Sequence, residues 1–182
     1  MNYFEQSFRD LIEVEGGYSD NTHDSGGRTN WGITEAVARR NGYTGDMRDL
    51  PKSEAQRIYR AQYWDILNLD RVSDRSYPVA HELFDTGVNM GVGRAGRFLQ
   101  RSLNALNNKQ TIFSDIQVDG LIGPGTLAAL NALFMRRGPE SQVVLLRMLN
   151  CLQGAFYIEL AEAREKDEEF VFGWFRTRVA IR

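Results

Sequence analysis

The sequence contains little cysteine and little histidine. Its 182 residues include one cysteine, Cys151, and two histidines, His23 and His81. A single cysteine excludes an internal disulfide and a zinc site built on several thiolates, and two histidines are too few for most other metal sites. We therefore expect neither a metal ion nor a cofactor. Cys151 stands in the apolar stretch 143–156, where we expect a buried, unreactive thiol.

Neither sign of charge dominates, and long hydrophobic runs are absent. The chain has 22 Lys and Arg against 24 Asp and Glu, a net charge of −2, which argues against a nucleic-acid partner. No uninterrupted apolar run reaches the roughly 18 residues of a membrane span, so we expect no stable membrane insertion. The first ten residues carry acidic side chains and lack the apolar core of a signal peptide, which predicts synthesis in the cytoplasm.

Helical spacing of apolar residues dominates the chain. It predicts a mainly α protein with a small β-hairpin near residues 18–33. Gly16 and Gly17 end the first helix, Thr34 caps a second, and Ser53 with Gln56 forms a capping box for a third. The expected helices cover 4–15, 34–40, 53–67, 78–90, 94–106, 124–137 and 141–169. On the last, we expect Val144, Met148, Cys151 or Leu152, Ala155 and Ile158 to form the buried stripe. Near Trp174, we expect a C-terminal helix docked on the core.

Glu15 is the first candidate catalytic residue. At 100° per residue, the step from Phe4 to Glu15 is three turns plus about 20°, so Glu15 falls on the stripe that Phe4 and Phe8 bury. Burial and the negative end of the helix dipole both favour the protonated carboxyl. A raised pKa is what a general acid needs at neutral pH. The alternative is a Glu15 that pairs with an arginine and anchors the following loop.

The loop after the first helix contains a second carboxyl. Asp24 follows Glu15 after eight residues and has Ser, Gly and Asn around it, so it is expected to stay ionised. Two carboxyls in contrasting environments are what glycoside hydrolysis requires. One protonates the leaving oxygen. The other stabilises positive charge on the sugar or activates water, with help from a hydroxyl such as that of Thr29. The alternative for Asp24 is a turn-forming Asx motif.

Further polar and aromatic residues are candidates for substrate binding. Tyr59, Tyr63 and Trp64 could stack on sugar rings, although core packing is the more frequent role of such residues. His81, Asp85 and Asn89 are spaced by four, so they share one helix face, where Asp85 and Asn89 could bind hydroxyl or N-acetyl groups. The alternative is a solvated face or contacts between helices.

The chain contains a series of blocks typical of one enzyme family, namely Val14–Asp20, Asp24–Thr34, Ile58–Arg60, Tyr63–Asp65, Glu82–Gly91, Ala95–Gln100 and Val118–Leu127. With these blocks the chain resembles glycoside hydrolase family 108, the phage and prophage endolysins that cleave peptidoglycan as N-acetylmuramidases. The resemblance implies a lysozyme-like helical fold, Glu15 as the catalytic acid, and release through a holin. We also expect Tyr18 and Asn30 to bind substrate. In phage-type lysozymes of another family the Glu–Asp spacing is the same, but a Thr follows the Asp after five residues, whereas Thr29 follows after four.

The second half resembles the peptidoglycan-binding region often paired with that catalytic part. We therefore expect a catalytic part, 1–90, packed against a helical binding part, 91–182. The predicted protein is a monomer that is made in the host cytoplasm and acts on peptidoglycan glycan strands of the bacterial cell wall, in the periplasm. The alternatives are a lytic transglycosylase and a non-catalytic protein that binds the wall or serves secretion.

Overall fold

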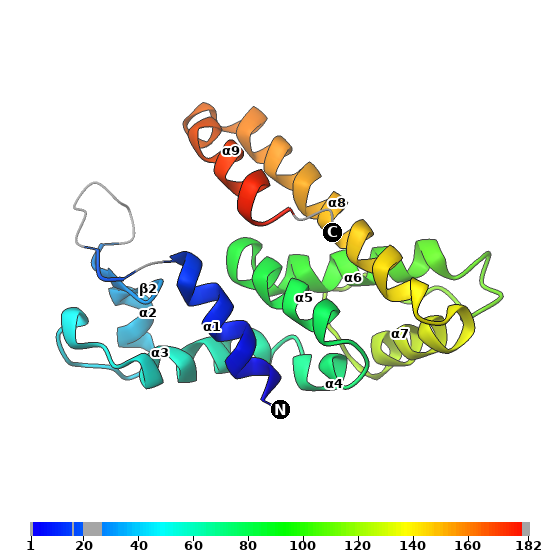
Figure 1. Cartoon of the computed structure of the whole chain (residues 1–182), viewed down its shortest axis with the longest axis horizontal. Coiled ribbons are helices and arrows are strands. Elements are labelled where there is room, and N and C mark those ends of the chain that lie inside the picture. Colours follow the sequence, from blue (N-terminus) through cyan, green and yellow to red (C-terminus); the bar gives the residue numbers. More distant parts are fainter. Residues whose placement is uncertain (1, 16, 20–26, 180–182) are drawn as a thin grey trace. The chain divides into compact units, whose positions relative to one another are not determined.

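The computed structural model describes residues 2–15, 17–19 and 27–179, with the side chains of 13–15 excluded (Figure 1). It confirms a mainly α protein. The chain divides into two compact units, Met1–Asp70 and Arg71–Arg182, and each is described by itself. This division falls after residue 70, whereas the sequence predicted a boundary after residue 90. The predicted boundary between a catalytic part and a binding part stays a prediction.

The first unit holds the first helix, the hairpin and the short helices that follow the hairpin in the sequence. Its elements are α1 (Tyr3–Glu15), β1 (Thr29–Asn30), β2 (Ile33–Thr34), α2 (Glu35–Arg40), the 3-10 turn η1 (Met47–Asp49), α3 (Lys52–Tyr59), the π-helical turn η2 (Arg60–Trp64) and the first residues of α4 (Leu69–Ser73).

Aromatic rings build the core of this unit. The α1 stripe is buried as predicted, and it packs against α3 and η2. The ring centroids of Phe4 and Trp64 lie 5.4 Å apart, and those of Phe8 and Tyr59 lie 5.5 Å apart, both edge to face. Edge-to-face pairs of this kind stabilise a core beyond the area they bury. They fix the face of α1 that points inward.

The predicted hairpin is present and short. β1 and β2 pair antiparallel, with Asn30 opposite Ile33. Trp31 and Gly32 between them have φ angles of 53° and 71°, the left-handed pair that a two-residue hairpin turn needs. Thr34 then caps α2 by accepting a hydrogen bond from the Val37 amide, as expected. The expected capping box of Ser53 and Gln56 does not form, because α3 begins at Lys52 after Pro51 and lacks a side-chain cap.

The second unit is a bundle of helices. It contains α5 (Tyr77–Met90), α6 (Val92–Leu106), α7 (Pro124–Arg137), α8 (Glu140–Ala163), the 3-10 turn η3 (Glu165–Asp167) and α9 (Glu168–Thr177). α5 packs on α6 and α8, and α9 packs on α8. Trp174 of α9 stacks on Tyr157 of α8 with ring centroids 4.6 Å apart, which confirms the docked C-terminal helix.

The turn before α7 is held by one amide side chain. Gln100 of α6 donates to Asp119 Oδ1 at 2.7 Å and accepts from the Gly120 amide at 2.7 Å. Hydrogen bonds from Gln100 and from the Leu121 amide lower the pKa of Asp119. Gly120 also approaches Gly96 so closely that a Cβ on Gly96 would lie 2.1 Å from the Gly120 carbonyl oxygen. These bonds give the turn a structural role.

Two expectations for α8 were wrong. Its buried stripe is displaced by about one residue, through Leu145, Leu149 and Tyr157, while Val144 and Ile158 are exposed. Cys151 is likewise exposed. The reason is that the buried face includes polar Asn150 and Gln153, so apolar spacing alone pointed to the wrong side.

The expected single helix over 141–169 also stops early, at Ala163. By length and composition alone, α8 could cross a membrane, and it is the one such helix found in the described part of the chain. A core helix of a soluble protein passes the same test, so this is weak evidence about membranes.

Candidate active site

Glu15 is the last residue of α1. Its backbone lies one turn beyond Leu11 and Ile12, which are buried in the core of the first unit. The helix phase predicted from the sequence is therefore the phase of the observed core stripe up to Ile12. The Glu15 side chain and its predicted pKa lie outside the described residues, and so does Asp24.

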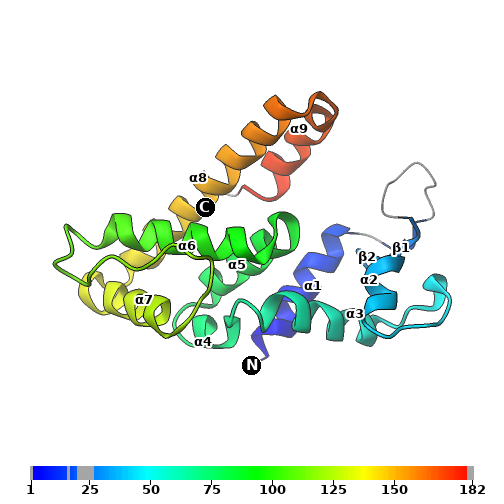
Figure 2. The same ribbon diagram turned by 180° about the vertical axis from the view of Figure 1, so that it is seen from behind.

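A pair of backbone hydrogen bonds closes the loop that contains Asp24. The Ser19 amide donates to the Thr29 carbonyl at 2.8 Å, and the Thr29 amide donates to the Ser19 carbonyl at 2.9 Å. Ser19 follows Glu15 by four residues. Since a chain spans at most about 3.3–3.6 Å per residue, Thr29 is held within roughly 20 Å of the Glu15 backbone. Figures 1 and 2 both show the C-terminal end of α1 on the hairpin side of the first unit.

Thr29 lies at the start of β1. Its hydroxyl donates to the Gly27 carbonyl at 3.3 Å, and its side chain is partly exposed. The weak bond leaves the hydroxyl's acceptor capacity available. The structure therefore places Thr29 at the backbone pairing with Ser19, and its catalytic role stays a prediction.

Tyr18 and Asn30 flank this loop and contact the η1 turn. The Arg48 guanidinium lies over the Tyr18 ring, 5.4 Å from its centroid. Asn30 is buried, and its amide nitrogen donates to the Met47 carbonyl at 2.7 Å and to the Arg48 carbonyl at 3.2 Å. Asn30 therefore ties η1 to β1, and a substrate contact from its amide nitrogen would have to compete with these bonds.

The structure places two of the three candidate stacking rings in the core. Trp64 is fully buried, and its indole nitrogen donates to Asp70 at 2.8 Å. Tyr59 is 2% exposed, and its hydroxyl donates to the Trp31 carbonyl at 3.2 Å. Trp64 packs against Phe4 and Tyr59 packs against Phe8, so both rings belong to the core in this structure and are not exposed for stacking on a sugar. Tyr63 is partly exposed and packs against Tyr59 with ring centroids 5.6 Å apart.

Asp85 and Asn89 lie in the second unit, on α5. Asn89 donates to Asp85 Oδ1 at 3.1 Å, Gln153 of α8 donates to Oδ2 at 3.1 Å, and Arg178 donates to Oδ1 at 2.9 Å. The Asp85 carboxylate therefore joins three segments of the second unit. This network fits the contacts between helices that were weighed against sugar binding, and sugar binding by Asp85 and Asn89 stays a prediction.

Sequence reasoning missed Glu82, one turn before Asp85. Its Oε1 atom is buried and has no hydrogen-bond partner among the described residues. Burial and, to a smaller extent, the nearby Asp85 carboxylate raise the pKa of Glu82, a hydrogen bond with Asn150 lowers it, and the net result is a pKa of about 8. The sequence carried no signal for this, since Asn150 is 68 residues away. The described residues contain no group of three His, Cys, Asp or Glu side chains that could hold a metal ion.

Comparison with known proteins places these residues in a family context. Residues 8–91 match the model of the glycosyl hydrolase 108 family, and residues 94–179 match that of a predicted peptidoglycan domain. No curated protein matches. Among solved structures, SagA of Brucella abortus is similar, with a TM-score of 0.71 and 27% sequence identity over 97% of this chain and 88% of that chain.

The order of the two matches is the order expected from the sequence, and together they span nearly all described residues. The first match begins within α1, at residue 8, and includes the hairpin and the position of Asp24. The second begins within α6, at residue 94, and continues through α9. A hydrolase region followed by a peptidoglycan region indicates an enzyme that degrades peptidoglycan. The chain therefore contains a region, residues 8–91, that matches the glycosyl hydrolase 108 family, followed by a region, residues 94–179, that matches a predicted peptidoglycan domain.

Proposed function

We propose that the protein is an N-acetylmuramidase, which hydrolyses the β-1,4 bond from N-acetylmuramic acid to N-acetylglucosamine. Glu15 donates a proton to the glycosidic oxygen. Asp24 stabilises the oxocarbenium-like charge or orients the attacking water, with help from Thr29. Peptidoglycan glycan strands are the substrate, and we extend the proposal to a phage or prophage endolysin that acts as a monomer on the cell wall after release through a holin.

The single observation that carries the proposal is the closure of the loop by Ser19 and Thr29. Their two backbone bonds join Ser19, four residues after Glu15, to Thr29, five residues after Asp24. This pairing supports a mechanism in which two carboxyls from neighbouring parts of the chain act together. Nothing in this arrangement requires a metal ion for the proton transfer.

The separation of the two carboxyls distinguishes two mechanisms. A separation of about 6.5–9.5 Å leaves room for a water and gives inversion, whereas about 5–5.5 Å allows a covalent intermediate and gives retention. We propose inversion. We propose that Tyr18, Asn30 and Tyr63 bind the sugar residues beside the cleaved bond.

Mass spectrometry of the muropeptides released from purified peptidoglycan tests the proposal. A muramidase adds one water and leaves a reducing muramic acid end. A lytic transglycosylase adds no water and leaves an anhydro-muramyl end, and a non-catalytic wall-binding protein releases neither. Reducing N-acetylglucosamine ends would instead show that the other glycosidic bond is cut, and they would refute the assigned bond while leaving a glycosidase.

A further inference from the structure

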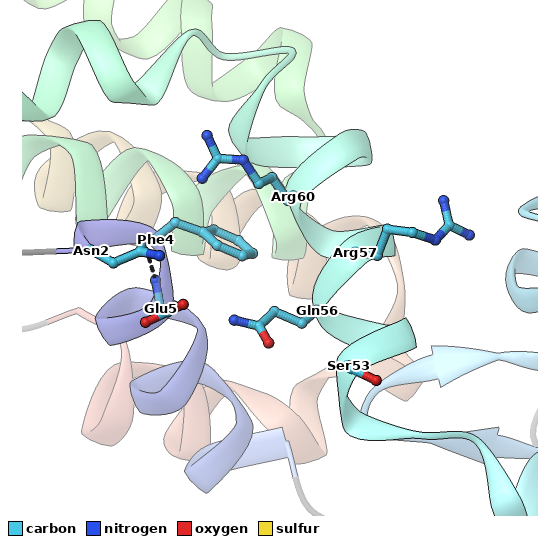
Figure 3. A pocket seen from close by; sticks show the side chains of 7 residues that line it. All are labelled: Asn2, Phe4, Glu5, Ser53, Gln56, Arg57 and Arg60. Carbon is cyan, nitrogen blue, oxygen red and sulfur yellow. Dashed lines mark hydrogen bonds between the residues drawn. The ribbon is translucent and has the colours of Figure 1, made fainter.

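A hollow lies in the first unit, at the N-terminal end of α1. It is open, has a volume of about 310 Å³, and is lined by seven residues of α1, α3, η2 and their flanks. That volume is at the lower end of the range for small-ligand sites. The lining residues are Asn2, Phe4, Glu5, Ser53, Gln56, Arg57 and Arg60 (Figure 3).

Opposite charges face this hollow without pairing with each other. The Arg60 guanidinium lies over the Phe4 ring, 5.2 Å from its centroid, and its Nε and Nη2 atoms are held by Asp65 and Asp70 at 3.3 and 2.5 Å. Its Nη1 atom has no partner among the described residues. Within that same part of the chain, the Glu5 carboxylate also has none, and Figure 3 shows the Gln56 amide turned toward it.

This arrangement suits a ligand end that carries both charges on a short carbon chain. A carboxylate would accept from Arg60, whose orientation the two aspartates already hold. An ammonium would pair with Glu5, and the Gln56 amide could bond either group. A ligand with an ammonium alone would leave the Nη1 donor of Arg60 without an acceptor, and a ligand with a carboxylate alone would leave Glu5 without a cation.

We propose that this hollow binds the zwitterionic end of a peptidoglycan stem peptide, namely the far end of a diamino acid that carries an ammonium and a carboxylate on one carbon. The inference rests on the proposed function for its substrate class. It adds a subsite that reads the peptide, about 15 Å along α1 from Glu15, since ten residues separate Glu5 from Glu15. A three-residue stem spans at most about 10 Å, so the stem belongs to a sugar beside the cleaved bond rather than at it.

Binding of soluble stem peptides to the full-length protein tests the proposal. The probes are L-alanyl-γ-D-glutamyl-meso-diaminopimelate and the same tripeptide with L-lysine in the third position, which lacks the far carboxylate. Because exposed ion pairs contribute little, we expect a Kd on the order of 0.1–1 mM for the first probe. The lysine probe should bind at least about five-fold more weakly. Equal affinity for both probes would overturn the proposal.

Matched variants locate the binding. Glu5→Gln and Arg60→Gln should each weaken the diaminopimelate probe at least about five-fold. Arg39→Gln is the control, because Arg39 lies in α2, does not line the hollow, and pairs with Glu35 at 2.8 Å. Arg60→Gln also removes two ion pairs, so its thermal unfolding is recorded, and Glu5→Gln decides if that variant unfolds. Unchanged binding in Glu5→Gln would refute the assignment.

Failure of this inference is distinguishable from failure of the proposed function. Peptide binding is measured without turnover, while digestion of glycan strands stripped of their peptides reports hydrolysis without the stem. Cleavage of stripped strands with no peptide binding refutes only the subsite. Peptide binding with no cleavage of any strand supports the subsite and refutes the muramidase.

Discussion

Arg178 and Asp85 form an ion pair that spans 93 residues of sequence. The Arg178 Nη1 atom donates to Asp85 Oδ1 at 2.9 Å, and the two side chains are only 12% and 22% exposed. Asp85 lies in α5, and Arg178 comes directly after α9. The pair therefore fastens the end of the described chain to the first long helix of the second unit.

Arg178→Ala should lower the free energy of unfolding by roughly 1–3 kcal/mol, because the mostly buried Asp85 carboxylate loses its cation. Urea denaturation measures the effect. The control is Arg164→Ala, whose partner Asp167 lies 3.9 Å away from a 61% exposed side chain, and it should cost less than about 0.5 kcal/mol. Equal effects of the two variants would show that the Asp85 pair is no stronger than a surface pair.

Glu82 should make stability depend on pH. Its pKa in the folded protein is about 8, above that of an exposed glutamate, so the folded state holds the proton more tightly than the unfolded chain. Stability contributed by this protonated group is fully present below the unfolded pKa and is lost as pH rises from about 4.3 to about 8. Glu82→Gln should remove this loss and flatten the profile.

The thermal midpoint of Glu82→Gln, measured at half-unit steps from pH 5 to pH 9, checks the effect. The amide of the glutamine can donate to Asn150, whose Oδ1 atom is buried and has no partner among the described residues. The exposed Glu162 provides the control, since Glu162→Gln should keep the wild-type slope. A wild-type slope in Glu82→Gln as well would mean that Glu82 is ionised throughout.

Glu15→Gln should reduce hydrolysis of peptidoglycan by about 10²–10⁴-fold, the usual contribution of a general acid. The variant should unfold at the wild-type temperature. Clearing of a cell-wall suspension gives the rate, and Glu13→Gln, on the same helix but about 200° from Glu15, should stay near the wild-type rate. Activity of Glu15→Gln within about three-fold of wild type would remove Glu15 from the mechanism.

Asn30→Ala should lower the free energy of unfolding and leave the KM for peptidoglycan largely unchanged. The amide nitrogen of this buried side chain bonds two carbonyls of η1, so its loss should cost roughly 1–3 kcal/mol. Chemical denaturation and the KM for peptidoglycan are measured on the same preparation. Unchanged stability with a raised KM would return Asn30 to the substrate-binding residues.

Gly96→Ala should disrupt the contact of α6 with the turn at Gly120. The added Cβ would lie 2.1 Å from a backbone oxygen, so α6 or the turn must shift, at a cost of roughly 1–3 kcal/mol or more. Gly125→Ala in α7 is the matched control, because nothing lies within 4 Å of its Cβ position. That variant should be neutral or gain up to about 1 kcal/mol from helix propensity. Similar stability of the two alanine variants would contradict the close approach.

The sequence predicted features that depend on neighbours along the chain. The α1 stripe, the presence of a short hairpin near residues 18–33 and the end of α5 at Met90 follow from helix period and local backbone preference. The buried face of α8 was misjudged because Gln153 takes a core position by bonding Thr86, 67 residues away, and Asn150 takes one by bonding both the Leu146 carbonyl and the distant Glu82. The pKa of Glu82 depends on the same distant contacts.

For the candidate site, the spacing of Glu15, Asp24 and Thr29 along the chain was enough to propose them as a catalytic set. The burial of Trp64 and Tyr59 was not, because an aromatic ring has the same spacing in the sequence whether it packs inward or faces a ligand. Only the ring contacts with Phe4 and Phe8 distinguish the two.

The division of the chain after Asp70 has a consequence for any attempt to excise the hydrolase region. The family match ends at residue 91 and so includes α5, yet the apolar side of α5 is covered by α6 and α8. A fragment that ends at residue 91 would expose the side chains of Val79, Leu83 and Phe84 to solvent, and it should aggregate. A chimera that exchanges the hydrolase region between such enzymes therefore has to keep α5 together with α6 and α8, which cover its apolar side.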